Sequence, residues 1–65
     1  MKYKKAARMH REAVQCSLNM ASTVDMLCKE VAGKRYSGAI LSVMILHEQA
    51  NRLHKVCNVA RTGGG

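Results

Sequence analysis

Residues 36–60 read YSGAILSVMILHEQANRLHKVCNVA, and this stretch decides the fold. Small or apolar residues repeat along it at alternate steps of three and four, at Tyr36, Ala39, Val43, Leu46, Ala50, Leu53, Cys57 and Ala60. Such a heptad repeat is the seam by which one helix packs along another. The stretch therefore predicts a long helix over about residues 37–60, with the Ser37 hydroxyl as its N-cap.

The preceding part of the chain carries a second stripe at steps of three and four residues, at Met9, Ala13, Cys16, Met20, Val24, Leu27 and Val31. This stripe predicts a helix over about residues 4–32. Gly33 is expected to adopt the left-handed conformation that ends this helix. A loop of about four to five residues then makes antiparallel packing the default. We predict an all-α fold in which residues 1–61 form one antiparallel helical hairpin and residues 62–65 a flexible glycine tail.

A single hairpin of this size cannot bury its apolar residues away from water. The chain has 65 residues, and a domain of that length buries only about 60% of the surface of its unfolded chain. Two rods cover one stripe each without enclosing a core, so we expect a homodimer that forms a four-helix bundle. The residues expected at a protein interface are Ala39, Ile40, Leu41, Val43, Met44, Ile45, Leu46, Ala50, Leu53 and Cys57.

Residues 39–46 are apolar around the whole helix, with Ser42 as the only interruption. A heptad seam covers only part of that surface, so Ile40, Leu41, Met44 and Ile45 would lie partly outside a simple dimer. An exposed patch of this kind marks a further interface. The alternative is a bundle with faces wide enough to bury most of these residues.

The charge of the chain is strongly positive, with 11 Lys and Arg against 4 Asp and Glu and a net charge of +7. Each acid has a base one turn away, in the pairs Arg8–Glu12, Asp25–Lys29, Glu30–Lys34 and Glu48–Arg52. The bases left over are Lys2, Lys4, Lys5, Arg11, Arg35, Lys55 and Arg61. Because cations at the start of a helix oppose its dipole, the N-terminal lysines are not explained by helix formation.

An antiparallel hairpin would bring Lys55 and Arg61 back beside the N-terminal lysines. A concentrated positive field of this kind attracts polyanions, of which nucleic acids are the commonest inside cells. With Tyr3 and Tyr36 as the only aromatic residues, contacts with the phosphate backbone should dominate over base reading. The alternative interpretation is a basic surface that only keeps the protein soluble.

The run from Leu46 to Cys57, followed by Ala60, Arg61 and glycine, resembles the second helix of Rop. The segment Leu18-Asn19-Met20-Ala21 is similar to the Leu-Asn-Met-Ala of that family's first helix. Rop proteins are small homodimeric helical hairpins that bind paired RNA loops in plasmid copy-number control. The resemblance therefore implies a dimeric bundle, RNA as the ligand, and Asn19 on the RNA-binding face.

The sequence also departs from the Rop pattern. Thr23 stands where the family has an aromatic residue on its RNA face, and Leu27 stands where it has a glutamine. The first helix is about nine residues longer at its N-terminus, and the region between the helices is about four residues shorter. With these departures noted, the residues predicted to bind nucleic acid are Lys2, Lys4, Lys5, Arg8, Arg11, Asn19, Lys55 and Arg61.

Other classes of function find little support in the residues. Cys16, His54 and Cys57 could ligate zinc, but their spacing is not a known ligand signature, so we predict no metal and no cofactor. No acid pair, phosphate-binding loop or cleft supports an enzyme. No apolar run has the length of a membrane span, and the charged N-terminus does not read as a secretory signal.

These observations predict a cytoplasmic, non-enzymatic, homodimeric RNA-binding regulator. The odd number of cysteines is in keeping with reduced thiols inside a cell. The alternative is an adaptor or inhibitor of phage or plasmid type. Such a protein would dock on a host enzyme or complex through the apolar patch of the helix at residues 37–60.

Overall fold

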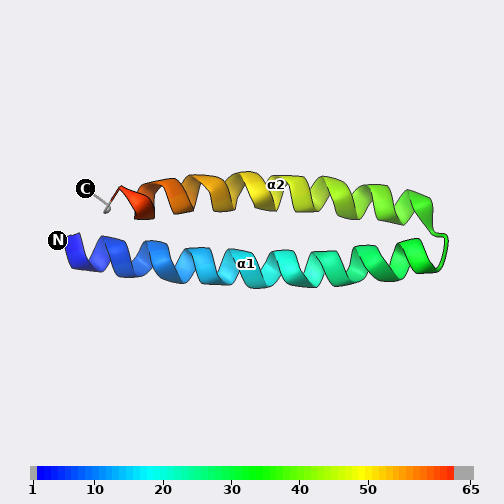
Figure 1. Cartoon of the computed structure of the whole chain (residues 1–65), viewed down its shortest axis with the longest axis horizontal. Coiled ribbons are helices and arrows are strands. Elements are labelled where there is room, and N and C mark those ends of the chain that lie inside the picture. Colours follow the sequence, from blue (N-terminus) through cyan, green and yellow to red (C-terminus); the bar gives the residue numbers. More distant parts are fainter. Residues whose placement is uncertain (1, 63–65) are drawn as a thin grey trace.

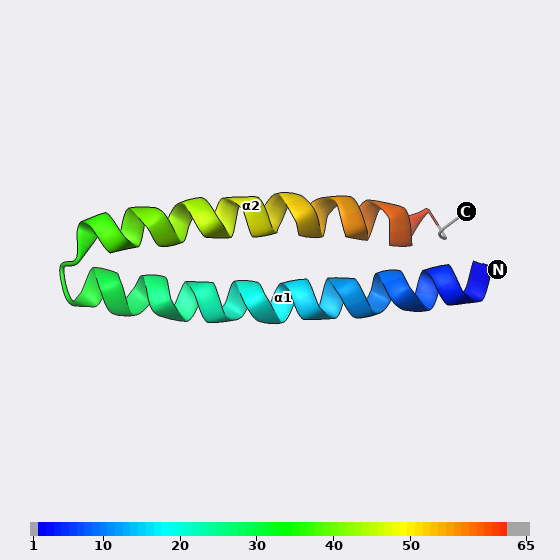
Figure 2. The same cartoon turned by 180° about the vertical axis from the view of Figure 1, so that it is seen from behind.

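The hairpin consists of two long helices joined by a tight turn. A computed structural model describes the backbone of residues 2–62 and the side chains of residues 7–62. Helix α1 spans Lys2–Ala32 and helix α2 spans Tyr36–Arg61. The helices run antiparallel and side by side, so that the start of α1 and the end of α2 meet at one end (Figure 1, Figure 2). The molecule measures 49 × 14 × 11 Å, and the all-α helical hairpin is confirmed.

The turn differs in detail from the predicted one, because the left-handed residue is Lys34 (φ 59°) and not Gly33. The Lys34 N–H donates to Val31 O at 3.0 Å, and the Arg35 N–H donates to Glu30 O at 2.8 Å. This pair of bonds is a Schellman motif, which satisfies the last free carbonyls of α1. Gly33 is the residue before the left-handed position, so the expectation of a left-handed Gly33 was wrong.

Helix α2 begins at Tyr36, one residue before the predicted start. The Ala39 N–H donates to Arg35 O at 2.9 Å, which makes Arg35 the N-cap, and no side chain caps the helix. Ser37 was wrongly predicted as the cap, because the Schellman turn leaves only residues 33–35 between the helices and places Ser37 inside the first turn of α2. Of the predicted glycine tail, only Thr62 is among the described residues.

The line along which the helices touch is shifted from the predicted seam. On α2, the buried or half-buried positions that repeat along this line are Ala39, Ser42, Leu46, Gln49, Leu53 and Val56. The other positions of the predicted seam are exposed: Tyr36, Val43, Ala50, Cys57 and Ala60. The observed contact line and the predicted seam both repeat at steps of three and four, and they share residues 39, 46 and 53. The structure therefore uses the neighbouring line of α2, with two polar residues in it.

Helix α1 shows the same shift in its second half. Met9, Ala13, Cys16, Met20 and Leu27 lie toward α2 as predicted. Nearer the turn, Thr23 and Glu30 occupy the contact line, whereas Val24 and Val31 are exposed.

Two hydroxyl groups on this line have hydrogen-bond partners, one within its own helix and one across the pair of helices. The Thr23 hydroxyl donates to Asn19 O at 3.0 Å, and the Ser42 hydroxyl donates to Glu30 Oε1 at 2.7 Å. The core that remains is small, because Cys16, Ala39 and Val56 are the only buried apolar residues among those described.

Candidate interaction surfaces

Exposed apolar side chains gather in the half of the hairpin next to the turn. Among the described residues, 12 large apolar side chains are exposed, and nine of them fall in residues 24–45. We call residues 24–45 the tip half, and the end where α1 begins and α2 ends the base. The nine side chains are Val24, Met26, Val31, Tyr36, Ile40, Leu41, Val43, Met44 and Ile45.

Eight of the nine exposed side chains form two groups, and the ninth, Met26, belongs to neither. Successive residues of a helix are rotated by about 100°. This rotation places the first group on one side of the hairpin, and we call it the apolar stripe: Val24, Val31, Tyr36, Ile40 and Val43. The second group, Leu41, Met44 and Ile45, covers the outward and opposite sides of α2, and we call it the outer patch. The outer patch lines a shallow hollow together with Val43, His47 and Glu48.

The predicted interface residues of α2 thus divide into two sets. Ala39, Leu46 and Leu53 pack toward α1 inside the hairpin. The residues that are available to another molecule are Ile40, Leu41, Val43, Met44, Ile45, Ala50 and Cys57. Sequence reasoning could not separate the two sets, because a heptad repeat does not say which neighbour each position faces.

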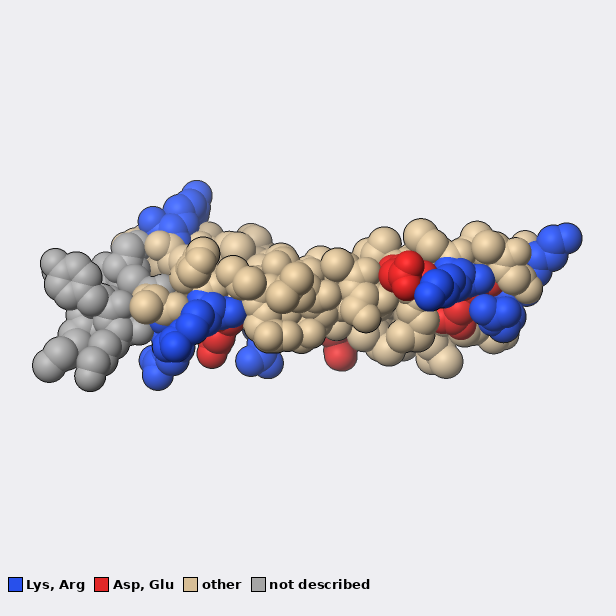
Figure 3. Space-filling model, turned by 90° about the horizontal axis from the view of Figure 1, so that it is seen from below, with Lys and Arg blue, Asp and Glu red and all other residues tan. Residues whose placement is uncertain are grey.

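The base carries the predicted cations. Arg8 and Arg11 on α1 and Lys55 and Arg61 on α2 are all exposed, and the antiparallel arrangement brings them to the same end. A view along the outer side of α1 shows Lys and Arg gathered toward the two ends of the rod, with a largely uncharged stretch between them (Figure 3). The backbone of Lys2, Lys4 and Lys5 belongs to the start of α1, but their side chains lie outside the described residues.

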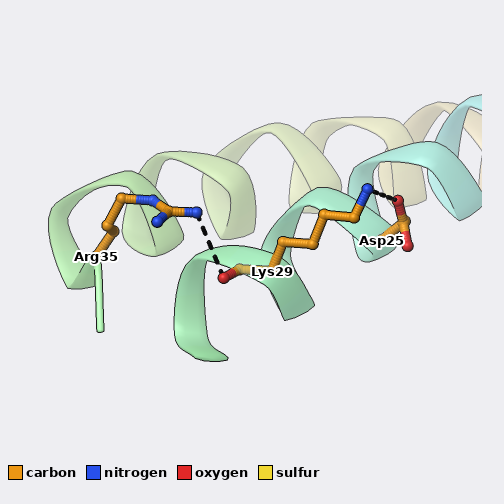
Figure 4. Close-up of polar contacts among 3 residues, drawn as sticks. All are labelled: Asp25, Lys29 and Arg35. Atoms are coloured by element: carbon orange, nitrogen blue, oxygen red, sulfur yellow. Dashed lines mark hydrogen bonds and ion pairs between the residues drawn. The ribbon is translucent and has the colours of Figure 1, made fainter. Parts of the chain in front are cut away.

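Of the four predicted ion pairs, the structure contains one. Lys29 Nζ lies 3.1 Å from Asp25 Oδ2, and Arg35 Nη2 donates to Lys29 O at 3.4 Å (Figure 4). No other ion pair joins the side chains described for residues 7–62. Glu30 is turned toward Ser42 instead of Lys34. Arg8 and Arg52 therefore join the cations without an acidic partner in this part of the chain.

Asn19 lies on a different side of the molecule from the apolar stripe. It shares a shallow hollow with Glu12, Gln15, Cys16, Gln49 and Arg52. The Gln15 amide donates to Asn19 Oδ1 at 3.1 Å, and Gln49 Oε1 is buried without a hydrogen-bond partner among the described residues. Sequence reasoning missed Arg52 and Gln49, because Arg52 was assigned to Glu48 and Gln49 lies between two predicted seam positions.

The three cysteines differ in their surroundings. Cys16 is 7% exposed and its thiol donates to Gln49 O at 3.4 Å, whereas Cys28 and Cys57 are exposed. Within the described residues, the structure assembles no group of three or more metal-ligating His, Cys, Asp or Glu side chains, so Cys16, His54 and Cys57 are not brought together as a site. In the same part of the chain, neither helix combines the length and apolar character needed to cross a bilayer.

Comparison with known proteins adds no relative to this description. No protein-family model matches the chain, no curated protein matches it, and no solved structure matches it. The similarity of the second helix to Rop stays a prediction.

Proposed function

We propose that this chain is a cytoplasmic, non-enzymatic RNA-binding regulator that acts as a homodimer and holds RNA at its base. The observation that carries the proposal is the gathering of exposed Arg8, Arg11, Lys55 and Arg61 at one end of an antiparallel hairpin. Helix α1 has no acidic residue in its first turn to offset these charges. Such a field attracts polyanions, and nucleic-acid phosphates are the commonest of these inside cells.

The expected mode of binding follows from the residue types at the base. Arginine and lysine side chains contact phosphate oxygens, and such contacts position an RNA without reading its bases. Tyr36, the aromatic residue whose side chain is described, lies at the tip and so is distant from the base. We therefore expect recognition of the shape and charge of a folded RNA. RNA is preferred to DNA in this proposal because of the resemblance to Rop.

The proposed dimer is supported by the small core of the single hairpin. No large side chain among the described residues is fully buried, and the apolar stripe remains in contact with water. Exposed apolar patches of this kind are uncommon on soluble monomers and mark interfaces. A second hairpin laid over the stripe would form a four-helix bundle, in which each helix uses a wider face than in an isolated pair.

The salt dependence of binding tests this function. Affinity for a fluorescent RNA stem-loop is measured between about 50 and 200 mM salt, with a DNA stem-loop of the same sequence as the comparison. Binding through several phosphates predicts a loss of about 10-fold or more over this range and tighter binding of the RNA. An affinity that does not change with salt contradicts the proposal.

A second candidate function is a protein-binding adaptor or inhibitor that docks through the outer patch. The observation that favours it is the exposure of Leu41, Met44 and Ile45, each of which is 50% or more exposed. These three side chains lie on the side of α2 away from the stripe. In this case Met44→Glu combined with Ile45→Lys abolishes capture of a protein partner while helical content stays unchanged. Nuclease treatment before capture separates the two functions, because it removes a partner held by RNA and leaves one held by the outer patch.

A further inference from the structure

We propose that the second copy overlaps the tip half and about the next two helical turns, in the opposite direction, so that the two bases lie at the far ends of a rod longer than either chain. This inference rests on the homodimer of the proposed function and specifies its geometry. The apolar stripe of one copy then packs against the apolar stripe of the second copy, with Val43 near the two-fold axis.

The distribution of apolar side chains along the stripe supports this overlap. Val24 and Val31 on α1 and Tyr36, Ile40 and Val43 on α2 all lie within the tip half. Val24 and Val43 lie at nearly the same distance from the turn, so a two-fold axis near Val43 sets these two residues of one copy against the same two residues of the other. Apolar side chains would then meet apolar side chains, the contact that releases most surface from water.

The alternative is a full-length overlap, in which the two hairpins lie side by side along their entire length. The same side chains would then have different neighbours. With the axis at the middle of the hairpin, Val31 and Tyr36 of one copy would lie against the base of the other. The helical rotation puts His54 and Arg61 on the stripe side of the base, and both are exposed in the single chain. Covering an arginine with apolar residues removes its hydration without supplying an acidic partner, which is unfavourable.

The division of charge along the chain favours the same arrangement. The tip half has three bases, Lys29, Lys34 and Arg35, against Asp25 and Glu30, which gives a net charge of +1. The remaining +6 of the total +7 therefore belongs to residues 1–23 and 46–65. A full-length overlap sets each weakly charged tip beside a strongly charged base of the same sign, whereas a tip overlap brings together the two weakly charged halves.

The two arrangements differ in length and in the positions of the two exposed cysteines. A tip overlap centred on Val43 gives a rod of about 75 Å, whereas a full overlap keeps the length near about 50 Å. In the tip overlap, the two copies of Cys28 lie about 15 Å apart and the two copies of Cys57 about 45 Å apart. In the full overlap, the corresponding separations are about 30 Å and about 20 Å.

Small-angle X-ray scattering combined with spin labelling tests the inference. Scattering from the unlabelled protein gives the maximum dimension of the dimer. Two single-thiol variants, each with Cys16→Ala, carry a nitroxide at Cys28 (with Cys57→Ser) or at Cys57 (with Cys28→Ser). We expect a maximum dimension near 75 Å, strong dipolar broadening between Cys28 labels and a long distance between Cys57 labels.

A maximum dimension near 50 Å, or Cys57 labels closer together than Cys28 labels, overturns the tip overlap. A protein that stays monomeric at several hundred micromolar also overturns it. RNA binding is measured on the same preparations, which separates the two proposals. A tip-overlapped dimer without affinity for RNA removes only the RNA-binding function, and a full-length dimer that binds RNA removes only the overlap.

Discussion

Lys34 occupies the one strained backbone position described in the turn. Its φ of 59° lies in the left-handed region, where a side chain is crowded by the neighbouring carbonyl oxygen. The Schellman bonds to Val31 and Glu30 hold it there because they satisfy carbonyl groups at the end of α1. The neighbouring Gly33, which could adopt this conformation at no cost, is not the residue that does so.

Replacing Lys34 with glycine should therefore stabilise the hairpin. Lys34→Gly removes the side chain that opposes the left-handed conformation, and we expect the free energy of unfolding to rise by about 0.5–1 kcal/mol. The control is Lys55→Gly, the same change inside α2, which should lower stability by about 1 kcal/mol. Urea titrations followed by circular dichroism measure both. Equal destabilisation by the two changes would show that Lys34 is not strained.

Glu30, Ser42 and Gly38 form a second local arrangement near the turn. The Glu30 carboxylate accepts the Ser42 hydroxyl and lies against Gly38, where an added Cβ would collide with Glu30 Oε2. The negative charge also lies close to the start of α2, the positive end of its dipole. The absence of a side chain at residue 38 thus leaves the space that the carboxylate fills.

A double-mutant cycle tests this arrangement. Glu30→Ala alone should lower the free energy of unfolding by about 1 kcal/mol, because Ser42 is buried and loses its acceptor. In a Gly38→Ala background the carboxylate is already displaced, so the same change should have little effect. The coupling energy from four urea titrations is the measurement. Effects of Glu30→Ala that are equal in the two backgrounds would contradict the contact.

At the scale of the helix, α2 carries two heptad lines, and this limits what its sequence predicts. The steps of three and four correctly indicate a helix, and the short turn correctly indicates antiparallel packing. They do not identify the line that faces α1, because Val43 and Ala50 repeat with the same period as Ser42 and Gln49. Polarity favours the wrong line, since Ser42 and Gln49 are buried or half-buried while Val43 is 50% exposed.

The candidate surfaces can be predicted from the sequence only in part. The meeting of Arg8 and Arg11 with Lys55 and Arg61 follows from hairpin topology alone, which the sequence predicts. The loss of the Glu48–Arg52 pair does not, because side-chain rotamers on an exposed helix face are nearly equal in energy. The position of Asn19 beside Gln49 and Arg52 also depends on which lines of the two helices are in contact.

Two valines near the end of α2 distinguish the contact line from the outer side. Val56 is 8% exposed and Val59 is 37% exposed, although they are one turn apart. Val56→Ala should lower the free energy of unfolding by about 1–2 kcal/mol, because it leaves a gap against α1. Val59→Ala should change it by less than about 0.5 kcal/mol. The order of the two midpoints in urea checks the register, and the reverse order would contradict it.

At the scale of the whole molecule, the single hairpin buries few apolar side chains among the described residues, and we expect the proposed dimer to add to its stability. Cys16, Ala39 and Val56 are small residues, and their burial is a modest contribution for a domain of 65 residues. Since a second copy that binds only the folded state adds stability by mass action, the melting temperature should rise with protein concentration.

Val43→Glu tests the contribution of the apolar stripe to this association. In the proposed dimer Val43 lies near the two-fold axis, so a buried carboxylate there should raise the dimer dissociation constant by 100-fold or more. Met44→Glu is the control, because Met44 is 61% exposed on the outward side of α2. Sedimentation velocity between 1 and 300 μM measures both variants. A Met44 variant that dissociates while the Val43 variant stays dimeric would place the interface on the outer patch.

The positive charge of the base also acts on the molecule as a whole, since its residues come from both ends of the chain. Arg8→Ala combined with Arg11→Ala removes two exposed cations that form no ion pair with the described acids. If both arginines contact phosphates, the slope of log affinity for an RNA stem-loop against log salt should become shallower by about 1.8.

Lys29→Ala is the control, because Lys29 pairs with Asp25 at 3.1 Å in the tip half and its removal should leave the slope unchanged. Fluorescence anisotropy at four salt concentrations measures all three proteins, with circular dichroism to verify that they are equally folded. If Lys29→Ala reduces the slope as much as the two changes at the base do, the RNA is attracted by net charge and not held at the base.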